Sequence, residues 1–127
     1  MTDDLTQFKA AAFDHANDAL ITIDTDGIIR AWNNFAEELF GWSAEDVVGQ
    51  DVKIMIPERL RSAHDRGFFA AMESGHLASD GRARRTKSLT KSGGSVYVTM
   101  TFAVVQDAAG ETLGSVAVAR EWVREEE

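Results

Sequence analysis

The segment from Leu20 to Trp42 constrains the fold more than any other part of the sequence. It starts with aliphatic and β-branched residues, passes through Asp24-Thr25-Asp26-Gly27 and becomes apolar again from Ile28. Turn residues that end in glycine between two extended segments predict a β-hairpin. Asn34 then predicts a helix N-cap with Glu37 as its reciprocal partner, and Gly41 predicts the helix end. Short strands followed by a short helix are typical of an α+β domain with an antiparallel sheet.

Apolar spacing and turn residues predict the remaining elements. Thr2 or Asp3 can cap a first helix, in which Leu5, Phe8 and Ala12 form a narrow apolar stripe. Ser43 and Gly49 bound a short helical turn. Three further strands are predicted at Arg82–Thr90, Val96–Val105 and Leu113–Arg120, with a hairpin turn at Lys91–Gly94. We expect Val96, Val98, Met100, Phe102 and Val104 to share the face that packs against the core. The predicted core includes Ile21, Ile23, Ile29, Leu39, Phe40, Phe68, Val98, Met100 and Phe102.

The helix predicted from Pro57 to Met72 is the most informative element. Its proline suits a first helical position, where the missing N–H has no partner to lose. Leu60, His64, Phe68 and Met72 recur every four residues and therefore lie along one line of the helix. His64 is thus a titratable imidazole within an apolar stripe. Two interpretations remain open: a ligand-binding histidine, or a structural histidine bonded to a backbone carbonyl at the edge of the core.

Length, charge and cysteine content exclude several classes of protein. A chain of 127 residues is long enough for one domain with its own core. The absence of cysteine excludes disulfides, thiolate-bound zinc, covalently attached haem and cysteine-based photochemistry. A net charge of −8 argues against a nucleic-acid partner. No apolar run approaches the roughly 20 residues of a membrane span, and the acidic N-terminus is unlike a signal peptide, so we expect a cytoplasmic protein with no membrane contact.

The sequence does not predict an enzyme, and we assign no catalytic residues. Asp24 and Asp26 are turn residues, with no reason to be buried or to have shifted pKa values. Ser62-Ala63-His64 has no nucleophile elbow, and Lys91–Gly94 lacks the spacing of a phosphate-binding loop.

Residues 21–50, ITIDTDGIIRAWNNFAEELFGWSAEDVVGQ, resemble the opening of a PAS domain. The matching positions are Asp24, Gly27, Asn34, Gly41, Trp42 and Gly49, and the resemblance continues to about Arg120. It implies a PAS fold: a five-stranded antiparallel sheet with short helices packed on one face, and an N-terminal helix. We therefore expect an amphipathic helix at residues 1–16, a PAS domain at 17–123 and a polar tail at 124–127.

Residues 51–68, DVKIMIPERLRSAHDRGF, resemble the helix of FixL-type haem-binding oxygen-sensor PAS domains. The matching positions are Pro57, Glu58, Arg61, Ser62, His64 and Asp65. The resemblance implies a haem b cofactor with His64 as the metal ligand, Arg84 as the residue that responds to bound oxygen, and Met100 and Phe102 on the distal side. Leu60 and Phe68, on the line of His64, complete the candidate cofactor-binding set.

Two functions follow from these expectations. The first is a sensory input domain that binds a small ligand or cofactor, with haem b for gas sensing as a candidate. It would relay its signal to a kinase or other output protein through a homodimer or terminal-helix contacts. The alternative is a ligand-free dimerisation or protein-interaction module. A sensor needs a cavity near His64, Met100 and Phe102, and four small residues are expected beside it: Gly67, Ala71, Ser115 and Ala117.

Overall fold

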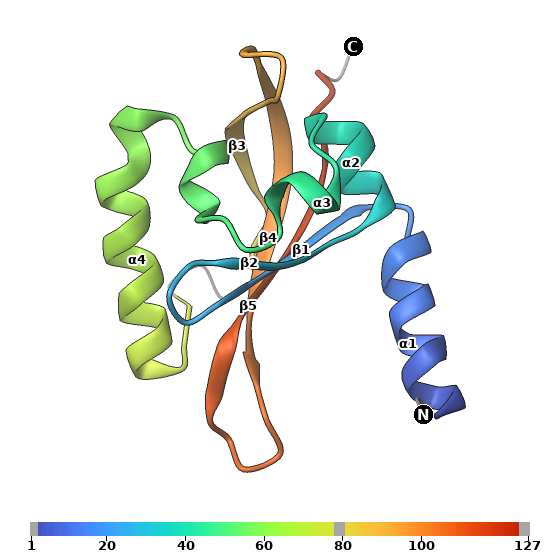
Figure 1. Ribbon diagram of the computed structural model, residues 1–127. Helices are drawn as coiled ribbons and strands as arrows, with labels where there is room; N and C mark the ends of the chain where they lie inside the picture. Colours follow the sequence, from blue (N-terminus) through green and yellow to red (C-terminus); the bar gives the residue numbers. More distant parts are fainter. Residues whose placement is uncertain (1–2, 78–80, 125–127) are drawn as a thin grey trace.

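The computed structural model describes residues 3–77 and 81–124 (Figure 1). Its helices are α1 (Asp4–His15), α2 (Asn34–Phe40), α3 (Ala44–Val47) and α4 (Arg61–Ser74), with the 3₁₀ turns η1 (Val52–Met55) and η2 (Glu58–Leu60). Its strands are β1 (Ala19–Asp24), β2 (Ile29–Trp32), β3 (Arg84–Leu89), β4 (Ser95–Gln106) and β5 (Thr112–Glu121). The central pair β4 and β5 runs through the middle of the domain, with α4 to one side and α1 at the opposite end (Figure 1).

The five strands form one antiparallel sheet in the order β2-β1-β5-β4-β3. This confirms the expected fold class. The first hairpin forms because Asp24 Oδ1 accepts hydrogen bonds from the N–H groups of Asp26 and Ile28, at 2.9 and 3.1 Å. Gly27 takes the left-handed conformation that the turn requires, with φ at +81°. Strand β3 is shorter than the predicted Arg82–Thr90, because its pairing with β4 runs only from Arg84 opposite Met100 to Leu89 opposite Ser95.

The predicted cap of α2 is wrong by one residue. Asn33, not Asn34, is the N-cap, and its Oδ1 accepts from the N–H of Ala36 at 3.0 Å. Glu37 does not close a capping box there, because its carboxylate accepts from the N–H of Ala44 at 2.7 Å. The cap moves to Asn33 because this side chain is buried, whereas Asn34 is exposed and its side chain lies 3.4 Å from His15 Nδ1.

The predicted helix from Pro57 to Met72 is also divided. Pro57 is extended, with ψ at 137°, and precedes the 3₁₀ turn of η2 rather than occupying a first α-helical position. The α-helix starts at Arg61, whose Nε donates to the carbonyl of Ile56 at 3.0 Å. It ends at Ser74, because the next residue, Gly75, is left-handed and its N–H donates to the carbonyl of Ala71.

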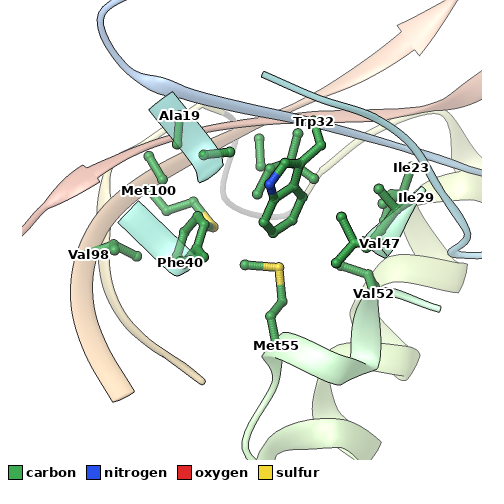
Figure 2. Close-up of a cluster of buried hydrophobic side chains, with 14 of the residues drawn as sticks. Ala19, Ile23, Ile29, Trp32, Phe40, Val47, Val52, Met55, Val98 and Met100 are labelled. Atoms are coloured by element: carbon green, nitrogen blue, oxygen red, sulfur yellow. The ribbon is translucent and has the colours of Figure 1, made fainter. Parts of the chain in front are cut away.

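The core lies between the inner face of the sheet and the helices (Figure 2). Trp32 and Phe40 are in contact there, with ring centroids 5.6 Å apart, and Met55 of η1 lies below them. The predicted core is confirmed: Ile21, Ile23, Ile29, Phe40, Phe68, Val98 and Met100 are buried, and Leu39 and Phe102 pack against them partly buried. Alternation on β4 therefore follows the predicted inner face.

Helix α1 contributes no buried residue to this core. It contacts α2 and leaves Leu5 62% and Phe8 73% exposed. Nowhere in residues 3–77 and 81–124 is there a helix long and apolar enough to cross a membrane.

Candidate functional site

A cavity of about 160 Å³ lies between the inner face of the sheet and the segment from η1 to α4. We call it the inner cavity. Its wall is mostly apolar and is built by Ile21, Ile23, Val52, Met55, Ile56, Leu60, His64, Thr86, Lys87, Ser88, Met100, Phe102, Ser115 and Ala117. Ser88 is buried, and its hydroxyl is satisfied by the carbonyls of Met55 and Leu89 at 3.3 and 2.9 Å. The inner cavity therefore presents an apolar surface with few free polar groups.

A second, more open cavity of about 230 Å³ adjoins the first beside α4. We call it the outer cavity, and it is lined by Ile23, Ala63, His64, Gly67, Phe68, Leu77, Arg84, Phe102 and Ser115. Gly67 leaves open space, because a Cβ added there would meet no other atom within 4 Å. Four residues line both cavities and lie at the junction between them: Ile23, His64, Phe102 and Ser115.

His64 is held by α4 in an unusual polar environment. Its Nδ1 is buried and has no hydrogen-bond partner within the described residues. The nearest carboxylate oxygen, Asp65 Oδ1, is 3.7 Å away, and the other oxygen of Asp65 is 3.4 Å from Lys53 Nζ. The His64 ring lies parallel to Phe68, with centroids 6.0 Å apart. The backbone-carbonyl bond expected of a structural histidine is therefore not made by Nδ1.

Burial also fixes the charge of this imidazole. Desolvation lowers the pKa of His64, and the Asp65 carboxylate opposes this effect only in part. The side chain is 28% exposed and is neutral at pH 7. A neutral imidazole keeps a nitrogen lone pair, which is the form that binds a metal ion.

The structure brings the six predicted cofactor-binding residues together around these cavities. Leu60 and Met100 line the inner cavity, Phe68 and Arg84 line the outer one, and His64 and Phe102 line both. Of the small residues expected nearby, Ser115, Ala117 and Gly67 line a cavity, whereas Ala71 is buried and lines neither. The described residues contain no group of three or more His, Cys, Asp or Glu side chains that could hold a metal ion, so His64 does not belong to such a group.

Comparison with known proteins identifies the family. The family model of the PAS fold matches residues 7–121. The chain belongs to the PAS family. As a PAS domain it is a sensory module for signal transduction, and no comparison gives positive evidence of catalysis.

Sequence relatives of this PAS domain include two named sensors. It is 52% identical over 48 residues to the sensor protein FixL of Bradyrhizobium diazoefficiens, covering 38% of this chain and 10% of that protein. It is 27% identical over 77 residues to the oxygen sensor protein DosP of Escherichia coli, covering 61% of this chain and 10% of that protein. The chain thus spans about a tenth of the length of each relative.

Solved PAS domains share the fold. A PAS domain from Colwellia psychrerythraea superposes with a TM-score of 0.79 at 23% identity, over 94% of this chain and 98% of that one. The PAS domain of an HTR-like protein from Haloarcula marismortui gives 0.71 at 18% identity, over 94% and 93%.

One wall of the inner cavity was not predicted from the sequence. The segment from Val52 to Ile56 forms a wall of the inner cavity, together with Thr86 and Ser88 of β3. Val52 and Met55 are apolar residues in a short 3₁₀ turn, which has no long periodic pattern to assign a face. The alternation of side chains along β3 could have predicted that Thr86 and Ser88 face the site, because both share the face of β3 that carries Arg84.

Proposed function

We propose that this PAS domain senses a small ligand held between α4 and the sheet, with haem b bound through His64 as the first candidate. The observation that supports it is a neutral, largely buried imidazole at the junction of two mainly apolar cavities. Similarity to two proteins named as sensors, one of them an oxygen sensor, supports a sensory role. The resemblance of residues 51–68 to haem-binding PAS domains supports the choice of cofactor.

The donor groups suit haem. When bound, haem would supply an iron atom that can take up a gas molecule. His64 would hold the iron through Nε2, because metal-binding histidines use one ring nitrogen and donate the other to a carboxylate or carbonyl. Asp65, 3.7 Å from Nδ1, is placed to accept that second bond after a small approach. Arg84 would contribute a permanent positive charge on the side of the outer cavity.

The volumes of the cavities suit haem less well than the donor groups do. The inner and outer cavities measure about 160 and 230 Å³. Each is below the roughly 300–1,000 Å³ of pockets that hold drug-sized molecules. A tetrapyrrole is larger than either cavity, so haem would have to join them by moving side chains at the junction.

This volume favours a second candidate, a compact apolar ligand without haem. An apolar cavity of about 150 Å³ is large enough to bind benzene or xenon. The inner cavity has a similar size, and its buried hydroxyl at Ser88 is already hydrogen-bonded within the protein. A ligand held there would be recognised mainly by shape and apolar contact.

Hemin titration followed by absorbance spectroscopy tests the haem proposal. We expect a Soret band in the wild type and its loss in His64→Ala. His76→Ala is the matched control, because this histidine is exposed and lies beyond the end of α4. A wild type that takes up no hemin would refute the cofactor. A Soret band that survives in His64→Ala would refute the ligand assignment.

Arg84 provides a separate test of gas sensing. In the haem-loaded protein, Arg84→Ala should keep the Soret band but release oxygen faster, because a charge-assisted hydrogen bond to the bound gas is lost. Arg30→Ala is the control, since this arginine lies on β2 and lines neither cavity. Equal oxygen dissociation rates in the wild type and Arg84→Ala would remove Arg84 from the proposal.

We also infer that the domain passes its signal to a partner, with a second copy of the chain and a kinase or other output protein as candidates. The exposed apolar side chains of α1, Leu5 and Phe8, support a contact through this helix. If neither hemin nor a small apolar molecule binds, a ligand-free interaction module becomes the better description.

A further inference from the structure

Three side chains form a cluster on the outer face of the sheet, where the chain leaves β5. The guanidinium carbon of Arg85 lies 5.5 Å from the ring centroid of Tyr97 and 4.9 Å from that of Trp122. The two rings meet edge to face, with centroids 6.4 Å apart and an interplanar angle of 68°. Both cation–ring distances fall within the range of about 6 Å at which a cation and an aromatic face attract.

The cluster joins three strands through their side chains. Arg85 comes from β3, Tyr97 from β4, and Trp122 directly follows the last residue of β5. The N–H of Trp122 also donates to the carbonyl of Tyr97 at 2.9 Å, which continues the β4–β5 pairing by one residue. Trp122 is half-buried. Its ring is therefore anchored on the outer face of the sheet.

The same strand, β3, also forms part of the cavity wall. Thr86 and Ser88 line the inner cavity and Arg84 lines the outer one. Because side chains alternate along a strand, Arg85 points to the opposite face from these three residues. Neighbouring residues of this edge strand thus contact the cavities on one face of the sheet and Trp122, which follows β5, on the other face.

We propose that Arg85, Tyr97 and Trp122 act as a clamp that couples cavity occupancy to the direction in which the chain leaves the domain. A displacement of β3 by a molecule in the cavity moves Arg85, and the stacked rings transmit that movement to Trp122. The coupling step rests on the proposed ligand site. The clamp itself does not, because its three side chains contact one another directly.

Hydrogen exchange of the Trp122 backbone N–H tests the clamp in the ligand-free chain. Removing a cation from two exposed rings, at about 0.5–1 kcal/mol for each ring, corresponds to exchange between about fivefold and thirtyfold faster. We expect this acceleration in Arg85→Gln. Arg30→Gln is the matched control, since it removes the charge of an arginine from β2, at the opposite edge of the sheet, and it should change the rate less than twofold. Equal rates in Arg85→Gln and the wild type would refute the clamp.

Nuclear magnetic resonance with benzene as the probe tests the coupling. Met55 and Met100 line the inner cavity, so their methyl signals report whether benzene enters. The indole N–H signal of Trp122, assigned with Trp122→Phe, reports the response at the clamp. In the wild type both sets of signals should shift. In Arg85→Gln the methyl signals should still shift while the indole signal no longer responds.

The outcomes separate the two proposals. Methyl shifts without an indole response in the wild type would refute the coupling and leave the ligand site intact. The absence of methyl shifts would count against the proposed small-ligand site and against its coupling to Trp122. The exchange rates of the Trp122 N–H would still show whether the clamp exists. An indole response that persists in Arg85→Gln would show that the signal reaches Trp122 by another route, and it would overturn the role of Arg85.

Discussion

Replacing Asn33 with alanine should cost more stability than any other single truncation of a polar side chain that we consider. Asn33 is fully buried between α1, β1 and α2. Its Oδ1 accepts from the N–H groups of Leu20 at 2.9 Å and Ala36 at 3.0 Å. Its Nδ2 donates to the carbonyls of Phe13 and Asp18, each at 3.0 Å. One amide thus ties the end of α1 and the start of β1 to the cap of α2.

The expected loss follows from these four bonds. A net contribution of about 1 kcal/mol per hydrogen bond gives a loss of about 4 kcal/mol for Asn33→Ala, before any added penalty for buried groups left without partners. Domains of this kind are stable by about 5–15 kcal/mol, so the variant would lose a quarter or more of its free energy of unfolding.

Urea unfolding followed by circular dichroism measures this loss. Asn34→Ala is the matched control, because Asn34 is the exposed neighbour and its side chain makes only a 3.4 Å contact with His15 Nδ1. Its change should stay within about 0.5 kcal/mol. Asn33→Asp keeps the acceptor for the two N–H groups but loses both donors. It should therefore be strongly destabilised at neutral pH and partly recover when acid protonates the new carboxyl group.

Two results would refute this reasoning. A loss below about 1 kcal/mol in Asn33→Ala would mean that water replaces the amide at little cost. Wild-type stability in Asn33→Asp would mean that the helix cap alone matters and that the bonds to Phe13 and Asp18 contribute nothing.

Three further predictions concern a close backbone contact, a buried imidazole and an exposed helix. Gly114→Ala should destabilise the fold by about 3 kcal/mol or more, because the added Cβ would overlap the carbonyl oxygen of Ile23, and thermal unfolding measures it. Since burial lowers the pKa of His64 below its ordinary 6.5, protonation favours the unfolded chain, and the free energy of unfolding should fall as pH decreases through and below 6.5. Unfolding curves of His64→Gln should lack this component. Removing residues 1–16, or replacing Phe8 with Glu, should convert a dimer into a monomer in sedimentation at about tens of micromolar.

Each of these three predictions has a control variant or an outcome that could contradict it. Gly110→Ala is the control for Gly114, because its Cβ would meet nothing within 4 Å although its φ is also positive, at +85°. If both variants lose the same stability, backbone conformation rather than overlap is responsible. Identical pH curves for wild type and His64→Gln would show that the imidazole charge does not affect folding. A wild type that sediments as a monomer would leave α1 without a self-association role.

The sequence by itself determined the elements that depend on local patterns. Turn residues at Asp24–Gly27 predicted the first hairpin, and alternation along β4 predicted which of its side chains enter the core. Spacing along the helix aligned His64 with Phe68, and their rings stack in the structure. Such features are predictable because neighbouring residues decide them through turn geometry and the period of the strand or helix.

Tertiary structure decided the features that depend on residues distant in sequence. Asn33 and Asn34 are chemically identical cap candidates, and burial against the carbonyls of Phe13 and Asp18 selects the first. Arg85 among several basic residues becomes distinct only because β4 and β5 bring Tyr97 and Trp122 beneath it.

The cavities depend on tertiary packing in the same way. Their volume is the space that η1, α4 and four strands leave unfilled, and no local pattern of residues encodes an unfilled space. The low pKa of His64 likewise arises from desolvation by packed neighbours, which sequence spacing alone does not measure. The sequence could therefore place a histidine on the right line of the right helix, and only the packed fold could make it neutral, largely buried and without a partner for Nδ1.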